Sequence, residues 1–218
     1  MRQWSGIIFA LSLVMALVMA GCQRQNDEET AFIEAKSSNR PIVAVVPVID
    51  HSRNDLAWNL SKELSTAIQQ RLVQSNHLYL PNPESFAAKT ERALASNHPF
   101  DSDYSWVKKF YSPHEFVAFL ELLEHREVPV SNTKDAPAEL SMTVRIRVFD
   151  IRGSSPKVVL QEIVEQSHHI PRQFTQTNFA QVPWGDEAYD VSPLGIAHDG
   201  LCKELTSRLE DYILLAGK

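Results

Sequence analysis

The chain has 218 residues with 27 acidic and 21 basic side chains, and its formal net charge is −6 at pH 7 with histidine counted as neutral. This mildly acidic balance, with no concentrated basic stretch, argues against a nucleic-acid-binding protein, which needs a basic face. The two cysteines are Cys22 and Cys202. If Cys22 is chemically modified, no intramolecular disulfide can form, so the stability of the fold must come from packing.

Residues 1–22 have the anatomy of an export signal that ends at a lipid attachment site. Arg2 supplies a positive amino-terminal charge, and residues 7–18 form an apolar run that is too short to span a bilayer. The stretch from Val18 to Cys22 resembles the lipobox of bacterial lipoproteins, with Met19 where leucine is usual. The resemblance implies cleavage before Cys22 and a diacylglycerol on its thiol. The alternative is an ordinary cleaved signal whose cysteine is incidental.

The segment after Cys22 is predicted to be a flexible tether. Residues 23–40 are polar and of mixed charge, and their one apolar pair, Phe32 and Ile33, is too small to hold a core. We therefore divide the chain into a signal peptide (1–21), a lipidated cysteine with its tether (22–40) and a single domain (41–218). In lipoproteins of the Gram-negative type, aspartate after the cysteine retains the protein at the inner membrane. Gln23 stands there, so the resemblance implies the outer membrane, facing the periplasm.

The domain begins with an apolar run over residues 41–48, bounded by prolines, which is typical of a central strand covered on both faces. A helix follows, capped by Asn54 or Asp55. Its predicted apolar stripe comprises Leu56, Leu60, Leu64, Ile68 and Leu72. A second short strand is predicted at residues 77–80, and a weaker helix from Ser85 to Leu94.

The middle of the chain is predicted to be helical. The order Ser112, Pro113, His114, Glu115 places a cap serine, a proline and a glutamate that can reach back to the cap, so we expect a helix to begin here. Its predicted apolar face comprises Phe116, Phe119, Leu120 and Leu123. A shorter amphipathic turn is expected over residues 104–111, and a short edge strand at residues 128–130.

The last third of the domain alternates in the period of a strand. Apolar residues from Leu140 to Val148 alternate with polar ones, which predicts one covered and one solvated face, with Arg145 and Arg147 on the solvated face. A turn at residues 153–156 and an extended segment to Ile170 complete a hairpin, and a helix is predicted from Leu201 to Ile213. The predicted fold class is α/β (α+β), with a single mixed β-sheet and packed helices.

This order of elements behind a lipobox resembles the envelope lipoproteins built on the TolB amino-terminal-like domain. That group includes the curli-secretion lipoprotein and the activators of penicillin-binding proteins. The matching residues are 43–47, then Leu60, Leu64 and Leu72, and later 144–150. The resemblance implies an envelope protein that binds another protein. Two features depart from it: the helical pattern of residues 89–127 argues against a curli-type pore, and the short tether argues against reaching a penicillin-binding protein.

No motif for enzymatic chemistry is evident. The eight histidines include no pair flanking a glutamate at helical spacing, and His168 and His169 should point to opposite faces of a strand, so we expect no metal and no cofactor. Cys202 lies on a helical stripe and is expected to be a buried hydrophobic residue, although His198 and Asp199 lie one turn away. An envelope hydrolase with carboxylates distant in sequence stays open, because paired acids need not be neighbours.

The loop of residues 182–190 is the most suggestive surface for a partner. Trp184 and Tyr189 are joined there with Asp186 and Glu187 between two prolines, a composition suited to anchoring a partner protein. The alternative is a loop that folds Trp184 back onto the core. We therefore expect a non-enzymatic accessory or assembly factor that binds another envelope protein. The alternatives are a hydrolase of peptidoglycan or a similar substrate, and an inert structural or surface lipoprotein.

Overall fold

The structure is a computed structural model that describes residues 39–133, 136–175 and 177–218, of which Pro41–Lys218 form one compact unit. The predicted signal peptide and Cys22 lie outside the described residues. In the described ranges, no helix combines the length and the apolar character needed to cross a bilayer.

The domain is built on one mixed sheet of five strands. They are β1 (Val43–Val45), β2 (Ile49–Asp50), β3 (Phe116–Pro129), β4 (Ala138–Asp150) and β5 (Lys157–Ile170). The order is β1-β3-β4-β5, and β2 also pairs with β3, farther along the same edge as β1. Strands β1 and β2 run parallel to β3, whereas β3, β4 and β5 are antiparallel to their neighbours. The predicted fold class, a mixed sheet with packed helices, is confirmed.

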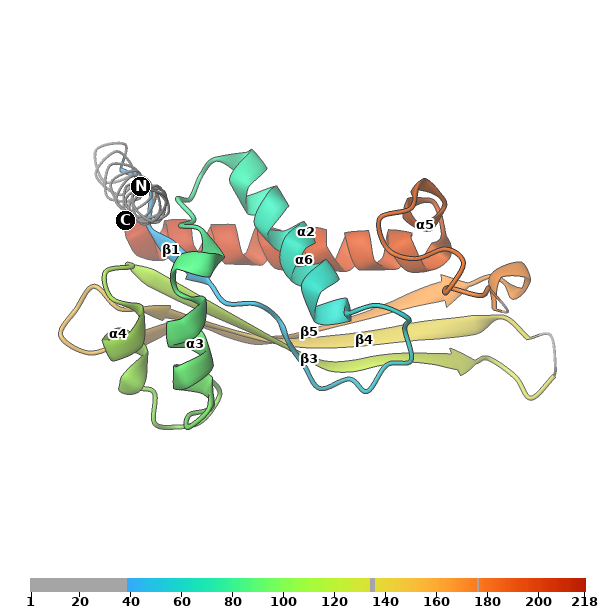
Figure 1. Cartoon of the computed structure of the whole chain (residues 1–218), viewed down its shortest axis with the longest axis horizontal. Helices are drawn as coiled ribbons and strands as arrows, with labels where there is room; N and C mark the ends of the chain where they lie inside the picture. The colour runs from blue at the N-terminus through green and yellow to red at the C-terminus, as the bar shows by residue number, and fades with distance from the viewer. Residues whose placement is uncertain (1–38, 134–135, 176) are drawn as a thin grey trace, which may run out of the picture. The chain divides into compact units, whose positions relative to one another are not determined.

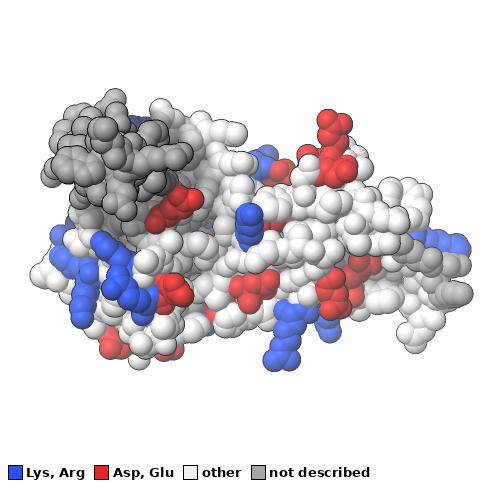
Figure 2. All heavy atoms as spheres, in the orientation of Figure 1, with Lys and Arg blue, Asp and Glu red and all other residues white. Residues whose placement is uncertain are grey.

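Helices cover both faces of the sheet, as Figure 1 shows. The helices α2 (Leu60–Ser75) and α6 (Pro193–Gly217) pack on one face. The short helix η1 (Pro83–Ser85), α3 (Ala87–Leu94) and α4 (Trp106–Tyr111) lie on the other. The connection from β5 to α6 contains η2 (Arg172–Phe174) and α5 (Glu187–Asp190). Figure 2 shows Lys and Arg side chains gathered over the end of the domain where α4 and the β4–β5 turn lie.

Two apolar cores result from this arrangement. The main core joins α2 and α6 to one face of the strands, and the second core joins α3 and α4 to the other face. Strand β1 contributes to both, because Val43 and Val45 face the main core while Ala44 and Val46 face the second. Residues 42–46 are therefore buried on both faces, as predicted, but β1 lies at one end of the strand order and is not a central strand.

Several predicted elements are confirmed, among them α3, α4, the β4–β5 hairpin and α6. Two predictions need adjustment. Helix α2 begins at Leu60, because the Asn59 side chain accepts a 2.9 Å hydrogen bond from the Lys62 N–H and caps the helix there. The predicted strand at residues 77–80 is reduced to one parallel bridge between Ile42 and Tyr79.

The predicted helix after Ser112 is wrong, because Phe116–Pro129 is strand β3. Residues 116–122 are all buried, since β1 and β4 flank them and helices cover both faces. Glu115 caps no helix. Its side chain accepts a 3.0 Å bond from the Ile42 N–H, and its own N–H donates to the Ile42 carbonyl at 2.8 Å. The helical pattern read from residues 89–127 therefore holds only for α3 and α4.

A β-bulge at Leu123 changes which side chains of β3 face the main core. Before the bulge, Leu122 pairs with Val144; after it, Glu124 pairs with Thr143, so Leu123 is an extra residue. Side chains alternate between the faces of a strand, and one extra residue exchanges the two faces for everything that follows. His125 consequently pairs with Met142 and lies on the main-core side of the sheet.

Deleting Leu123 should remove the bulge and leave a regular strand in which His125 still pairs with Met142. We expect the free energy of unfolding in urea to fall by less than about 1 kcal/mol, because every remaining side chain keeps its face. Deleting Ala118, in the regular part of β3, instead exchanges the faces of the residues up to the bulge and should cost at least about 2 kcal/mol, because Glu121 then turns toward the main core. Equal losses from the two deletions would contradict the assignment of Leu123 as the extra residue.

Candidate functional site

The loop of residues 50–59 separates two clefts in the surface. It leaves the carboxyl end of β2 and leads into α2, and the two clefts have volumes of about 870 and 610 Å³. The larger cleft lies between this loop and the start of α2. The smaller cleft lies between the loop and the part of β3 that follows the bulge. We regard these two clefts as the candidate site.

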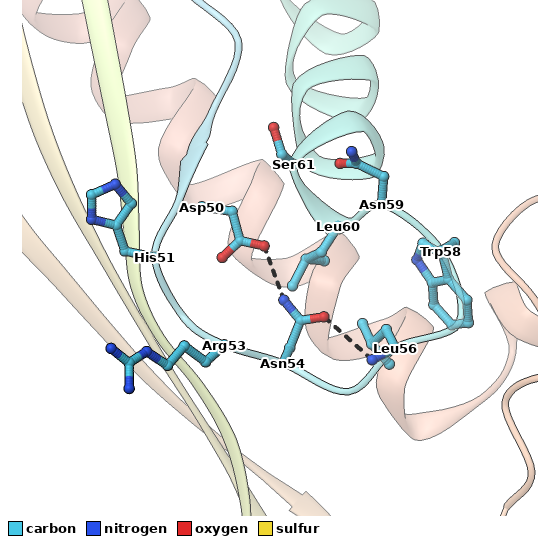
Figure 3. Close-up of a pocket in the computed structure, with 9 residues that line it drawn as sticks. All are labelled: Asp50, His51, Arg53, Asn54, Leu56, Trp58, Asn59, Leu60 and Ser61. Carbon is cyan, nitrogen blue, oxygen red and sulfur yellow. Dashed lines mark hydrogen bonds between the residues drawn. The ribbon is translucent and has the colours of Figure 1, made fainter.

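Side-chain hydrogen bonds hold the loop in shape. Asp50 Oδ1 accepts from the backbone N–H of Ser52 at 2.9 Å and from its hydroxyl at 2.7 Å. Asn54 Nδ2 donates to Asp50 Oδ2 at 2.9 Å, and Asn54 Oδ1 accepts from the Leu56 N–H at 3.3 Å. In Figure 3, Asp50 and Asn54 point toward each other, whereas His51 and Arg53 point away from the start of α2. The loop is thus ordered before any ligand binds.

The smaller cleft has an apolar floor and a charged rim. Five apolar side chains line it: Leu56, Leu123, Leu140, Phe179 and Leu194. The charged residues around it are Arg53, Asp55, Glu124, Arg126 and Glu127. An apolar floor with a few polar groups at the edge is typical of sites that bind an apolar group in a fixed orientation. His125 also lines this cleft and connects it to a buried cluster.

That cluster, here called the Glu63 cluster, consists of Trp58, Glu63, His125, Tyr189 and His198. Trp58 Nε1 donates to Glu63 Oε2 at 2.7 Å, and His198 Nδ1 lies 2.8 Å from Glu63 Oε1. The Tyr189 hydroxyl also donates to Glu63 Oε1. His198 Nε2 lies 2.9 Å from His125 Nε2. Five residues from α2, β3, α5, α6 and the loop therefore form one connected network.

The cluster holds an ionised carboxylate inside the protein. Burial alone would raise the pKa of Glu63, but the hydrogen bond and charge of His198, with the bonds from Tyr189 and Trp58, outweigh it and lower this pKa. Burial, followed by the charge of Glu63, raises the pKa of Tyr189. This hydroxyl therefore stays protonated and donates a hydrogen bond to Glu63. Because a carboxylate only accepts hydrogen bonds, His198 Nδ1 carries a proton.

His125 is the neutral end of the cluster. Burial, and then the charge of His198, lower the pKa of His125 to about 4. Because the two Nε2 atoms lie 2.9 Å apart, one of them carries the proton and the other accepts the hydrogen bond. His125 presents an uncharged imidazole to the smaller cleft at neutral pH.

The chemistry open to these groups is restricted. Both oxygens of Glu63 accept hydrogen bonds and the residue is only 3% exposed, so its carboxylate cannot reach a substrate. Cys202 is buried as predicted, and burial raises the pKa of its thiol to about 12, which leaves no thiolate at neutral pH. Among the described residues, no group of three or more His, Cys, Asp or Glu side chains is arranged to hold a metal ion.

A second buried carboxylate lies on the opposite face of the sheet. Glu121 is 1% exposed, and Arg145 Nε donates to its Oε2 at 2.8 Å. His98 Nε2 and His51 Nδ1 lie 3.3 and 3.6 Å from Glu121 Oε1. The prediction that Arg145 and Arg147 lie on a solvated face is wrong for Arg147, whereas the Arg145 side chain is 32% exposed. Arg147 is buried and donates to the carbonyls of Pro99 and Asp101 at 2.9 and 2.8 Å.

The aromatic residues of the predicted binding loop are not exposed as that prediction requires. Tyr189 is 3% exposed and belongs to the Glu63 cluster, so it is not a surface anchor. Trp184 is partly buried against the main core. Asp186 and Glu187 are exposed, and Asp186 caps α5 by accepting a 2.8 Å bond from the Ala188 N–H. Cys22, the predicted lipidation site, lies outside the described residues.

Little in the sequence indicates the site that the structure assembles. Glu63 is a polar position on α2, and His125 lies in a segment predicted to be helical, so neither could be paired with His198. One signal is present: His198 lies within the apolar stripe of α6, where an ionisable side chain requires a buried partner.

A comparison of the sequence with known protein families identifies the family of the chain. The model of a family of unknown function, DUF7499, matches residues 29–217. The chain belongs to the DUF7499 family. No curated protein is significantly similar to it.

The solved structures that resemble this chain include a hypothetical protein and two lipoproteins. The hypothetical protein CT253 from Chlamydia trachomatis is 27% identical with a TM-score of 0.63, over 80% of this chain and 98% of that one. Lipoprotein GNA1162 from Neisseria meningitidis is 9% identical, with a TM-score of 0.42 over 77% and 99% of the two chains. A minor lipoprotein from Acinetobacter baumannii is 13% identical, with a TM-score of 0.39 over 78% and 92%. Scores below 0.5 carry no weight, so the TolB-like group stays a prediction.

The lowered pKa of His125 should make the fold less stable in mild acid. In the unfolded chain this imidazole takes up a proton near pH 6.5, whereas in the fold it does so only near pH 4. The unfolded state therefore binds more protons in this window, and stability falls as the pH falls. Allowing for the partial exposure of His125, we expect a loss of about 2 kcal/mol between pH 6.5 and 4.

The measurement is urea unfolding at a series of pH values. His125→Gln should flatten the dependence in this window, while His169→Gln, at an exposed position of β5, should leave it unchanged. An unchanged slope in His125→Gln would show that another group takes up the proton.

Proposed function

We propose that this protein is a lipid-anchored bacterial envelope protein, attached through Cys22, whose domain binds another envelope protein at the smaller cleft. The signal sequence and the lipobox-like stretch from Val18 to Cys22 support the anchor. Gln23 supports a position at the outer membrane, facing the periplasm. In this proposal the protein acts as an accessory or assembly factor without catalysis of its own.

The observation that carries the binding proposal is the free edge of β3 beside the smaller cleft. β2 stops at Asp50, opposite Leu122, whereas β3 continues to Pro129. In the part of the chain that the structure describes, no strand pairs with this edge from Glu124 onward. An unpaired strand edge offers backbone donors and acceptors to an incoming strand.

The surroundings of this edge suit an extended segment of a partner. Exposed apolar side chains lie along it, since Val128 is 38% and Val130 62% exposed. An added strand would direct alternate side chains toward the apolar floor of the cleft. The ordered loop of residues 50–59 forms the opposite wall, so little conformational freedom is lost on binding.

The alternative of a hydrolase has one observation in its favour, which is the row of Glu63, His198 and His125 leading to the cleft. The complete engagement of Glu63 and the low pKa of His125 weigh against it, because neither is then a general acid or base near pH 7. Release of fragments from peptidoglycan by the purified domain would favour the hydrolase and overturn the proposal of a binding protein.

The anchor is tested by labelling cells that express the full chain with radioactive palmitate. We expect label on the wild type and none on Cys22→Ser, because acylation requires the Cys22 thiol. Cys202→Ser is the matched control and should keep its label. Label that persists in Cys22→Ser would contradict the anchor.

The binding surface is tested by placing a photoreactive amino acid at single positions in intact cells. Leu123 and Glu127, which line the cleft, should give one adduct of the same size with a partner protein. Val73 and Leu215 are exposed but distant from the cleft, and should not give it. The Leu123 and Glu127 adducts should disappear when Leu56→Glu places a charge on the cleft floor. Equal adducts at all four positions, or none beside the cleft, would contradict the assignment.

A further inference from the structure

We propose that the end of the domain at which the chain enters from the tether lies against the anionic phospholipid headgroups of the membrane. The inference deepens the proposed function, since it rests on the lipid anchor at Cys22 and adds how the domain is oriented. We call this part of the domain the entry end. It is defined by Pro41, helix α4, the β4–β5 turn and the last turn of α6.

Contacts between these segments bring them together at one place. Gly217 lies against Pro41, close enough that a methyl group added to its Cα would be 3.6 Å from Pro41 Cγ. Arg152, in the β4–β5 turn, donates to the Ala216 carbonyl at 2.8 Å, and its guanidinium lies 4.7 Å above the Phe116 ring. Lys108 of α4 donates to the carbonyl of Gly153. The start of the domain and three segments distant in sequence therefore share one surface.

That surface carries an excess of positive charge. Its basic residues are Lys108, Lys109, Arg152 and Lys157, and Figure 2 shows such side chains gathered there. Of the acids beside them, Asp150 pairs with Arg152 and cancels its charge, which leaves three lysines against Asp103 and Glu115. Asp150 accepts from Arg152 at 2.8 Å, which is the first cause of the lowered pKa of Asp150, and Glu115 accepts from the Ile42 N–H. Asp103, before α4, accepts from the Ser105 hydroxyl and N–H, which lowers its pKa.

The opposite end of the domain has the reverse balance. Figure 1 places α5 at the end of the sheet away from the β4–β5 turn. The exposed or partly exposed acids there are Asp55, Glu124, Glu127, Glu139, Asp186, Glu187 and Asp190, against Arg53, Arg126 and Arg172. An anionic bilayer would attract the entry end and repel the other, so charge alone favours one orientation.

Because the tether joins the domain to the lipid anchor, a weak attraction between the basic side chains and the headgroups is sufficient to orient the domain. Each basic side chain near an anionic surface contributes roughly a factor of five to binding. A lipid anchor on the tether would hold the entry end within a short distance of the headgroups, and so raise the effective concentration of the surface. The smaller cleft, about 30 Å farther along β3 as judged from the rise per residue, would then face away from the bilayer.

The test uses the soluble chain from Gln23 onward, which includes the compact unit Pro41–Lys218 and carries no lipid. It is sedimented with vesicles of equal parts phosphatidylglycerol and phosphatidylcholine, or of phosphatidylcholine alone. We expect binding only to the anionic vesicles, and its loss at high salt because exposed charges are screened. The double variant Lys109→Glu/Lys157→Glu should reduce the partition by at least about 30-fold, as expected when two basic contacts are lost.

The matched control is Lys62→Glu/Lys203→Glu. It makes the same change in net charge at exposed positions of α2 and α6, and should bind within about two-fold of the wild type. Equal binding to neutral and anionic vesicles, or an equal loss in both double variants, would overturn the inference. Because the soluble chain lacks Cys22, the result does not depend on lipidation. The palmitate experiment can therefore fail or succeed independently of it.

Discussion

The ionised carboxylate of Glu63 is the constraint on which the candidate site depends. An unpaired charge inside a protein is very costly, so each hydrogen bond that Glu63 accepts must be made in the folded state. The donors come from three separate segments: Trp58 at the end of the loop, Tyr189 in α5 and His198 in α6. Satisfying one carboxylate thus fixes the end of the loop and the approach to α6, which together set the shape of both clefts.

The bulge at Leu123 makes this arrangement compatible with a long central strand. Up to Leu122, β3 is buried on both faces and needs apolar side chains throughout. Beyond it the second face is no longer covered by α3 and α4, and polar side chains can be solvated there. The extra residue brings His125 to the main-core side at that boundary, where it meets His198. One local irregularity therefore serves both the packing of the sheet and the completion of the Glu63 cluster.

The elements that could be predicted from the sequence are those that bury a single face, because their apolar residues then recur at a regular spacing. Helix α6 and strands β4 and β5 each cover one face, so their apolar residues recur at helical or strand spacing. β3 is different, because a run buried on both faces has no period, and the capping signal at Ser112 favoured a helix. Tertiary pairing with β1 and β4 outweighed that local signal. The Glu63 cluster was hidden for another reason, since hydrogen bonds between residues up to 135 positions apart leave no local pattern.

The two ends of the domain differ in charge for a reason that follows from the topology. The entry end is where short connections and helix ends meet, and Arg152 and Lys108 there bind backbone carbonyls that strands and helices leave unpaired. The other end has the free edge of β3 and the start of α5, where Asp186 satisfies a backbone N–H group by capping. Satisfying carbonyls at one end and N–H groups at the other helps to separate basic from acidic side chains along the sheet. The same separation that completes the backbone hydrogen bonds gives the domain a direction that a charged bilayer can recognise.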